Sequence, residues 1–159
     1  MLGLMQTQPL LISSIIAHAA RHHQRAEIVS RTLDGSLHRT DYPTLERRSR
    51  RLAVALQALG VARHDRVATL AWNGYRHLEA YYAVSGSGAV LHTLNPRLFP
   101  EQIAYITNHA EDQYLIFELT FLPLIEAVAQ HCKTIKGYIL MCDRDRMPAQ
   151  SAIPNLMCY

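Results

Sequence analysis

Cysteine is scarce in this sequence. Only Cys132, Cys142 and Cys158 occur among 159 residues, their number is odd, and none stands in a CxxC pair. A disulfide framework and a structural zinc site are therefore not expected, and a reducing, cytoplasmic environment fits this usage best. Lysine is scarcer still, at Lys133 and Lys136, so arginine supplies nearly all the positive charge behind a formal net charge of +3. That small excess predicts no nucleic-acid partner.

Long hydrophobic runs are also missing. Apolar residues are densest in 10–23, which is too short to span a bilayer and which serines and histidines interrupt. No Lys or Arg precedes it, as a secretory signal would require. We therefore expect a helix here, with no integral membrane association. The spacing places Leu11, Ile15, His18 and Ala19 near one face, which we expect to be buried.

A glycine-rich phosphate loop is absent as well, since neither GxxxxGK[ST] nor GxGxxG occurs. The only closely spaced glycines lie in Ser85-Gly86-Ser87-Gly88, after a helical segment. The C-terminus of a helix is the negative end of its dipole, where phosphate is disfavoured. We therefore interpret 85–88 as a helix stop and a tight turn. No activated serine or cysteine nucleophile can be identified, so no catalytic residue is predicted.

What the chain does have is a succession of short apolar strands that alternate with helices. This alternation predicts an α/β fold in which helices flank a parallel sheet. The expected strands of the sheet are 66–72, 89–93, 114–117 and 138–142, and the expected helices are 43–59, 75–85, 100–109 and 121–131. Ahead of them, Asp34-Gly35 between 27–33 and 37–40 predicts a β-hairpin with a two-residue turn. Periodicity ends at Asp143, so we expect 143–159 to be an irregular connecting segment.

The segment 72–75, Trp-Asn-Gly-Tyr, is the best candidate for contact with a ligand. It follows the first predicted parallel strand, and open α/β sheets bind ligands at the carboxyl ends of their strands. Trp72 and Asn73 are therefore predicted to lie near a substrate. Both residues also have structural interpretations: Asn73 as the N-cap of the next helix, and Trp72 as part of the core.

Two other clusters have simpler explanations. His18 and His22 are spaced i, i+4, as two metal ligands on a helix would be, but the glutamate of an HExxH motif is missing and we expect no metal site. The run Glu46-Arg47-Arg48-Ser49-Arg50-Arg51 has no aromatic residues between its arginines for base stacking. We expect it to form the solvated side of a helix that is lined with leucine on its other side.

Several segments closely resemble medium- and long-chain fatty acid–CoA ligases of the adenylate-forming superfamily. They are Asp65-Arg66-Val67-Ala68, Ala71-Trp72-Asn73-Gly74-Tyr75-Arg76-His77, Tyr81-Tyr82-Ala83-Val84-Ser85-Gly86, and the stretches 88–98, 105–112 and 121–124. The likeness covers essentially the whole chain. It departs at His64, where the family usually has glycine, and at Arg39-Thr40-Asp41-Tyr42, where a Tyr-Thr-Tyr pattern is commoner.

The resemblance implies that 1–142 is part of an AMP-binding-type N-terminal domain, its first α/β layer, and that 143–159 leads to a remainder. It implies a parent enzyme that uses ATP, Mg²⁺ and CoA. The family's Pro-Lys-Gly phosphate loop, its Tyr-Gly-x-Thr-Glu segment and its catalytic lysine do not occur in this sequence. We therefore expect the chain to bind no cofactor and to be inactive alone, with the remainder of the ligase as its partner. A homodimer contact through the N-terminal region is a further expectation.

Two other hypotheses stay open. A stand-alone α/β interaction module derived from a ligase would pair with a full-length ligase and form one defined oligomer. A separated piece would instead expose apolar surface and associate non-specifically. A flavodoxin-like nucleotide binder would have the same alternation of strands and helices, although the missing phosphate loop argues against it.

Overall fold

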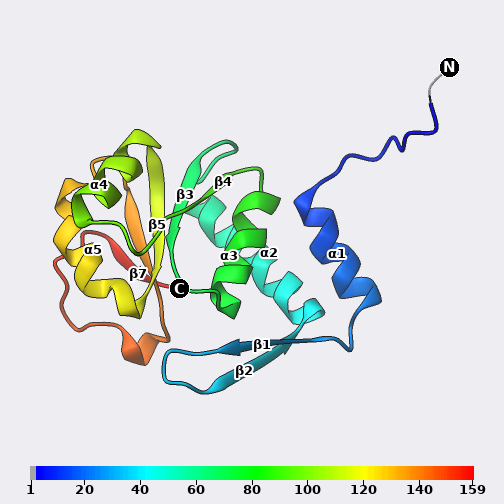
Figure 1. The fold of residues 1–159 in the computed structure, drawn as a ribbon, viewed down its shortest axis with the longest axis horizontal. Coiled ribbons are helices and arrows are strands. Elements are labelled where there is room, and N and C mark those ends of the chain that lie inside the picture. The colour runs from blue at the N-terminus through cyan, green and yellow to red at the C-terminus, as the bar shows by residue number, and fades with distance from the viewer. Residues whose placement is uncertain (1–2) are drawn as a thin grey trace.

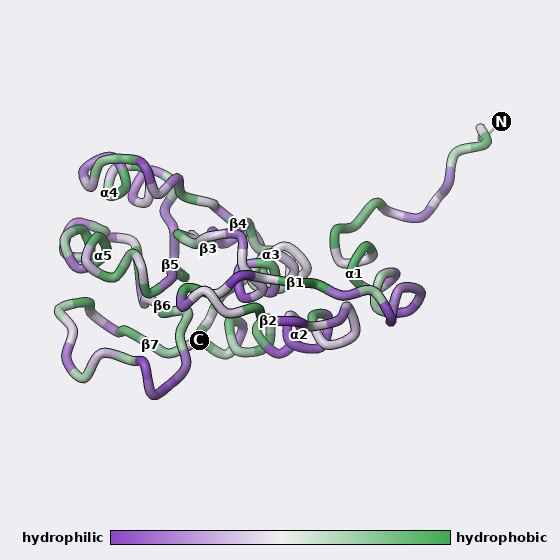
Figure 2. Tube along the Cα trace, turned by 60° about the horizontal axis from the view of Figure 1, so that its bottom comes forward, coloured by the Kyte–Doolittle hydropathy of each residue, from purple (hydrophilic) through white to green (hydrophobic). Residues whose placement is uncertain are grey.

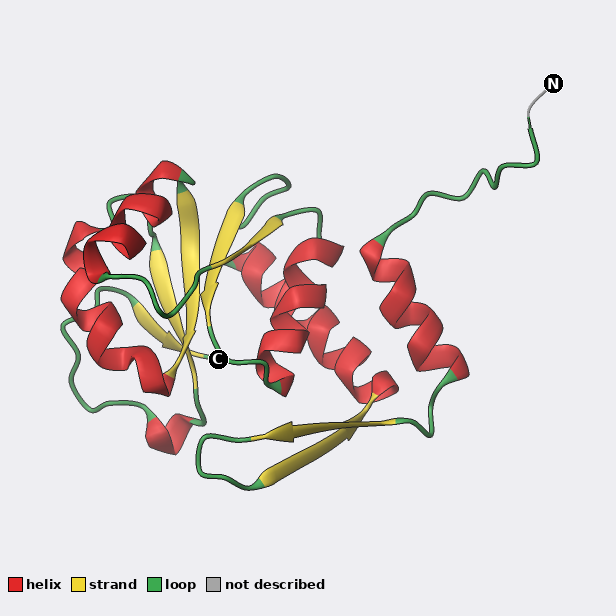
Figure 3. Cartoon of the chain, viewed as in Figure 1, coloured by secondary structure: helices red, strands yellow, loops and turns green. Residues whose placement is uncertain are grey.

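A five-stranded parallel sheet forms the centre of the computed structural model, which describes residues 3–159 (Figures 1 and 3). Its strands are β3 (Arg66–Leu70), β4 (Val90–Thr93), β5 (Asp112–Glu118), β6 (Gly137–Met141) and β7 (Leu156–Cys158). They lie in the order β4-β3-β5-β6-β7, and each neighbouring pair is parallel. The predicted α/β class is therefore confirmed.

Helices cover both faces of this sheet. They are α2 (Tyr42–Ala58), α3 (Tyr75–Gly86), α4 (Pro100–His109) and α5 (Leu122–Val128). The first two pack on one face and the last two on the other, and Figure 2 shows the two pairs on opposite sides of the strands. Neighbouring residues of a strand point to opposite faces. In β5, Leu115 joins the core beneath α4 and α5, while Ile116 joins the core beneath α2 and α3.

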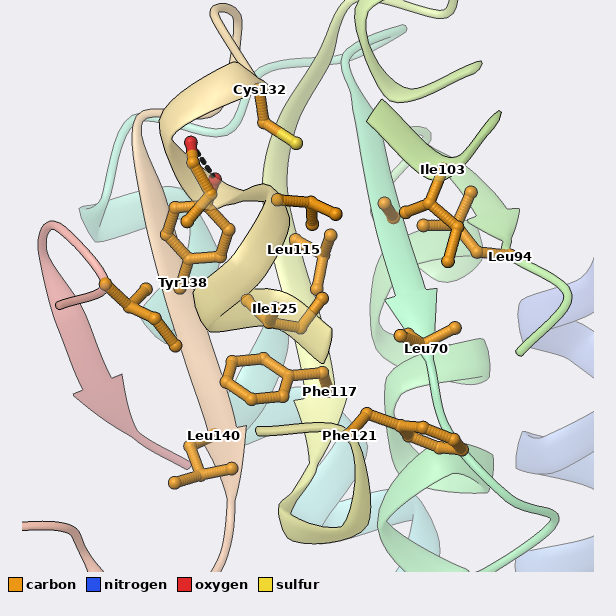
Figure 4. Packing of buried hydrophobic residues seen from close by; sticks show 14 of the residues in the cluster. Leu70, Leu94, Ile103, Leu115, Phe117, Phe121, Ile125, Cys132, Tyr138 and Leu140 are labelled. Atoms are coloured by element: carbon orange, nitrogen blue, oxygen red, sulfur yellow. Dashed lines mark hydrogen bonds between the residues drawn. The ribbon is translucent and has the colours of Figure 1, made fainter. Parts of the chain in front are cut away.

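The core beneath α4 and α5 is shown in Figure 4. Phe117 and Ile125 are fully buried there, and Tyr138 is nearly so. The Tyr138 hydroxyl donates a hydrogen bond to the carbonyl of Ala129 at 3.2 Å, which satisfies both groups away from water. The helix predicted over 121–131 is in fact α5 between two short 3₁₀ turns.

Local signals set where the helices end. The Asp41 carboxylate accepts a hydrogen bond from the backbone N–H of Thr44 at 2.8 Å and so caps α2. Gly60 and Gly88 follow α2 and α3 with φ of 89° and 83°, a left-handed conformation that glycine adopts without strain. His64 also has φ of 70°, at the position where the resembled ligases carry glycine. For a residue with a side chain, that conformation costs about 1 kcal/mol.

The first helix, α1 (Ile12–His22), differs from the prediction in the face it buries. It packs on α2 and α3 through Ile16, which is only 5% exposed. Leu11 and Ile15, expected to be buried, are 55% and 58% exposed. The prediction was wrong because apolar spacing identifies a face but not which of two apolar faces meets the protein. No helix in the described part of the chain is long and apolar enough to cross a membrane.

The predicted β-hairpin is present, but its turn is longer than expected. Strands β1 (Glu27–Arg31) and β2 (Leu37–Asp41) are antiparallel, and the last paired residues are Arg31 and Leu37. The turn therefore contains the five residues 32–36. Asp34 organises it by accepting hydrogen bonds from the Thr32 hydroxyl and from the backbone N–H of Ser36. These side-chain bonds hold a turn that the Asp-Gly pair alone did not predict.

The last residues also differ from the expected irregular segment. Strand β7 pairs in parallel with β6, and Ile153 is 4% exposed within the core beneath α4 and α5. The expectation of an irregular segment over 143–159 is therefore wrong for these residues. A three-residue strand has too few residues to show a period. The division into a domain over 1–142 and a connection after it stays a prediction, and Met1 and Leu2 lie outside the described residues.

Candidate functional site

A cleft of about 550 Å³ opens at the carboxyl ends of β3, β5 and β6, beneath the turn of the β-hairpin. Its walls come from segments far apart in the sequence: the turn, the start of α3 and the residues that follow each of the three strands. Those that carry polar or aromatic groups into it include Arg31, His38, Trp72, Tyr75, Arg76, Glu118, Asp143 and Arg146. This is the edge of an open α/β sheet at which ligands bind.

Trp72 contributes a wall of this cleft. Its side chain is 48% exposed, and its ring centroid lies 5.2 Å from that of Phe121. The alternative interpretation of Trp72 as a core residue is therefore wrong. Strand β3 ends at Leu70, two residues before the predicted end, so Trp72 lies in the loop that follows the strand.

Asn73 lies apart from Trp72. It lines a neighbouring cavity of about 330 Å³ between β1 and α3, together with Val29, His77 and Tyr81. Its expected role as a helix cap is wrong: Gly74 is the N-cap of α3, and no side chain caps this helix. The two residues predicted to lie near a substrate are thus brought to adjacent cavities rather than to one.

Glu118, at the end of β5, is one of the cleft residues that the sequence analysis missed. Its Oε2 atom is buried and has no hydrogen-bond partner among the described residues. Burial raises the pKa of Glu118, while a hydrogen bond from the backbone of Trp72 and the charge of Arg76 act in the opposite direction. A charged residue at the end of a buried apolar strand was the signal available in the sequence.

Arg76, the cation whose charge acts on the Glu118 carboxyl, is already paired. Arg76 donates a hydrogen bond to the Asp143 carboxylate at 2.6 Å, and its guanidinium lies 5.0 Å from the centre of the Tyr75 ring. Tyr75 in turn stacks on His38 of β2, with ring centroids 3.7 Å apart. Burial raises the pKa of Tyr75. These contacts join the β-hairpin, α3 and the segment after β6 around the cleft.

These residues do not fit the phosphates of ATP by themselves. A polyanion would have to compete with Asp143 for Arg76 and would approach Glu118, whose buried Oε2 atom lacks a partner among the described residues. We therefore derive no phosphate contact from this cleft. Groups that donate a hydrogen bond, such as a hydroxyl, amide or amine, complement Glu118 Oε2 instead.

A second polar network lies behind the cleft and joins α2, α3 and the last residue. Glu79 is 1% exposed and accepts hydrogen bonds from the Arg48 guanidinium and, at 2.7 Å, from the Tyr159 hydroxyl. Arg48 is 43% exposed, as expected for the solvated side of α2, but its guanidinium also pairs with this buried carboxylate, which the sequence did not predict. Arg50 does follow that expectation and forms an exposed pair with Glu46.

The paired histidines of α1 form no metal site in the described residues. The rings of His18 and His22 lie 4.5 Å apart, but no group of three or more potential ligands surrounds them or any other point in residues 3–159. The i, i+4 spacing does bring the two imidazoles together, on the exposed side of the helix.

Comparison with known proteins gives a consistent result. A family model described as AMP-binding enzyme matches residues 16–155. The chain is 52% identical over its full length to the 3-methylmercaptopropionyl-CoA ligase of Ruegeria lacuscaerulensis and 45% identical over its full length to the medium-chain-fatty-acid–CoA ligase of Ectopseudomonas oleovorans. Over 88% of its length it is 49% identical to the long-chain-fatty-acid–CoA ligase of Thermus thermophilus. It spans 29%, 29% and 26% of these proteins.

Solved structures share the fold at lower identity. Coronafacic acid ligase from Pectobacterium brasiliense superposes on 94% of this chain, and 28% of its own chain, with a TM-score of 0.75 and 16% identity. The fatty acyl CoA synthetase of Mycobacterium tuberculosis matches 86% of this chain and 28% of its own chain, with a TM-score of 0.68 and 24% identity. The family model covers most of the chain, and two of the matched ligases align over its full length. This chain belongs to the family of AMP-binding enzymes and corresponds to an amino-terminal part of its acyl-CoA ligases.

Proposed function

We propose that this chain serves as the amino-terminal portion of an ATP-dependent fatty acid–CoA ligase. In the parent reaction, the carboxylate of the acid attacks the α-phosphate of ATP, diphosphate leaves, and an acyl-AMP forms. The thiol of CoA then attacks the acyl carbonyl and AMP leaves. The observation that carries the proposal is the 45–52% identity, over the full length of this chain, to ligases that differ in acyl substrate.

The role proposed for this chain is to form one wall of the substrate site. Trp72 and Glu118 stand at the carboxyl edge of the sheet, where a second domain would close over a ligand. The indole supplies apolar area and Glu118 Oε2 an acceptor. Asn73, in the adjacent cavity, would lie near the same substrate. In this proposal ATP, Mg²⁺ and CoA are bound mainly by residues of the remainder, and the chain alone is inactive. A cytoplasmic location and a homodimer contact through the N-terminal region stay predictions.

A chimeric enzyme tests the proposal. The aligned amino-terminal part of the Ectopseudomonas oleovorans ligase, 29% of its length, is replaced by residues 1–159 of this chain. We expect the chimera to form acyl-CoA from a medium-chain acid, whereas the 159-residue chain alone catalyses no exchange between ATP and diphosphate. A folded chimera without activity, or exchange by the chain alone, would contradict the proposal.

Matched substitutions in the chimera test the proposed wall. Trp72→Ala removes the indole that borders the cleft, and we expect a rise in KM for the acid. Tyr105→Ala removes a similarly exposed aromatic ring, 67% accessible, from the outer surface of α4 and should leave KM unchanged. Equal effects of the two substitutions would show that Trp72 has no special relation to the substrate.

A further inference from the structure

Two of the three cysteines meet at the edge of the sheet. Cys142 comes directly after β6, and Cys158 is the last residue of β7. The parallel register places Leu140 beside Cys158, so Cys142 stands two positions further along and on the same face. The Cys158 thiol donates a hydrogen bond to the backbone carbonyl of Cys142, with the sulfur 3.3 Å from the oxygen. The pairing of two segments thus brings two thiols to one place in the core beneath α4 and α5.

The two thiols differ in their access to solvent. Cys142 is 5% exposed, and burial together with the neighbouring Cys158 thiol raises the pKa of Cys142 to about 11. A buried thiol with a raised pKa is a poor nucleophile towards reagents in solution. Cys158 is only half-buried, so a small reagent reaches this sulfur first. The pair therefore consists of one accessible thiol and one shielded thiol beside it.

The third cysteine lies elsewhere. Cys132 stands at the end of the 3₁₀ turn that follows α5 and is 6% exposed. Figure 4 shows it at the opposite end of this core from Leu140, the residue that pairs with Cys158. Along the sequence Cys142 is nearer to Cys132 than to Cys158, so an unfolded chain would close the shorter loop more easily. The fold thus selects the partner that sequence separation disfavours.

We propose that Cys142 and Cys158 are a redox-sensitive pair that a peroxide converts into an intrachain disulfide. The Cys158 thiolate attacks one oxygen of hydrogen peroxide, the O–O bond breaks, and hydroxide leaves with the proton that the thiol has lost, as water. The Cys142 thiol then attacks the resulting sulfenic sulfur, the S–O bond breaks, and the second water leaves with the Cys142 proton. Two thiols are oxidised to one disulfide and the peroxide is reduced to two waters. The inference is independent of the ligase assignment.

The disulfide ties the last strand to the sheet. Strand β7 has only three residues and lies at the sheet edge, so few backbone hydrogen bonds hold it in the reduced chain. Cys142 lines the cleft, and Tyr159, next to Cys158, donates its hydroxyl hydrogen bond to Glu79. Oxidation therefore fixes the end of the chain between the cleft and the buried network. A cross-link that closes a loop of this length raises Tm by roughly 6–12 °C.

Peptide mapping after oxidation tests the inference. The folded 159-residue chain is treated with hydrogen peroxide, the reaction is stopped with catalase, and the remaining thiols are alkylated in denaturant. We expect mass spectrometry of the proteolytic peptides to show one bridge, between Cys142 and Cys158, that dithiothreitol removes, while Cys132 is alkylated. The chain unfolded in urea before oxidation should also bridge Cys132. A folded chain that bridges Cys132, that links two copies, or that adds oxygen to its cysteines without any bridge would overturn the proposal.

Three single substitutions assign the effect to the pair. Cys142→Ser and Cys158→Ser each remove one partner, so their Tm should not rise on treatment with peroxide. Cys132→Ser is the matched control: it removes a cysteine that is equally buried, and its Tm should rise as in the unchanged chain. Circular dichroism of the reduced variants checks that each one folds. A rise in Tm that persists in Cys158→Ser, or that is lost in Cys132→Ser, would also overturn the proposal.

Discussion

Glu79 allows the sharpest test of how α2, α3 and the end of the chain are held together. Its side chain is 2% exposed, and it is bonded to the Arg48 guanidinium and the Tyr159 hydroxyl. Glu79→Gln keeps the shape of the side chain but removes the charge and turns one acceptor into a donor. At least one of the two partners then loses its acceptor.

The expected loss follows from these contacts. Removing one partner of a buried ion pair lowers the free energy of unfolding by about 3–5 kcal/mol. Arg48 is 43% exposed and can be hydrated, and glutamine retains one acceptor, so we expect about 2–3 kcal/mol. For a chain of this length that corresponds to a fall in Tm of roughly 4–12 °C. Tyr159→Phe removes the hydroxyl that donates to the carboxylate at 2.7 Å and lies 3.4 Å from the Arg76 carbonyl, and it should lower the free energy of unfolding by about 1.5 kcal/mol.

Urea unfolding followed by circular dichroism measures these values, with Glu46→Gln as the control. That substitution makes the same chemical change in the pair with Arg50, whose side chain is 74% exposed and stays hydrated, and should alter stability by less than about 1 kcal/mol. The double variant of Glu79→Gln with Tyr159→Phe should lose less than the sum of the single variants, because both break the same contact. If the loss in the double variant equalled the sum of the losses in the two single variants, Glu79 and Tyr159 would not interact. Equal effects of Glu79→Gln and Glu46→Gln would likewise show that the buried network adds no stability.

Two other predictions concern α1 and the cleft. Ile16→Ala should lower the free energy of unfolding by about 2–4 kcal/mol, whereas Ile15→Ala should change it by less than about 0.5 kcal/mol; equal losses in urea unfolding would contradict the orientation of α1. Burial raises the pKa of Glu118 above its usual 4.5, so the folded chain holds a proton that the unfolded chain has lost. The contribution of Glu118 to stability therefore declines as pH rises from 4.5 through the raised pKa, and Glu118→Gln should remove this decline. The prediction would be contradicted if the free energy of unfolding changed with pH to the same extent in the unchanged chain and in Glu118→Gln.

The periodicity of the sequence determined the architecture. Runs such as Val67-Ala68-Thr69-Leu70, followed by helices with their stop signals, were sufficient for a parallel sheet covered on both faces, because burial on both sides requires strands that are apolar throughout. Turn and helix ends at Gly60 and Gly88 also followed from local chemistry. These features depend on residues close together in the chain, so the sequence alone contains the information.

The candidate site was predicted only in part. The position of Trp72 beside the cleft was predictable, because the rule that ligands bind at the carboxyl ends of parallel strands depends on strand direction alone. The same rule did not separate Trp72 from Asn73, which face different cavities. It also missed Glu118, because its burial depends on the loop after β3 lying over the end of β5.

Tertiary structure alone decided which surfaces meet. Apolar residues lie on two sides of α1, one with Leu11 and Ile15 and one with Ile16, and only packing on α2 and α3 selected the latter. Likewise, Arg48 pairs with Glu79, a residue 31 positions away, whereas Arg50 pairs with Glu46 on its own helix. The sequence by itself determined the elements and their order, since these arise from local periods. Contacts between distant elements arise from side-chain volumes and charges that meet only after folding, and these decided the buried face of α1, the final strand and the walls of the cleft.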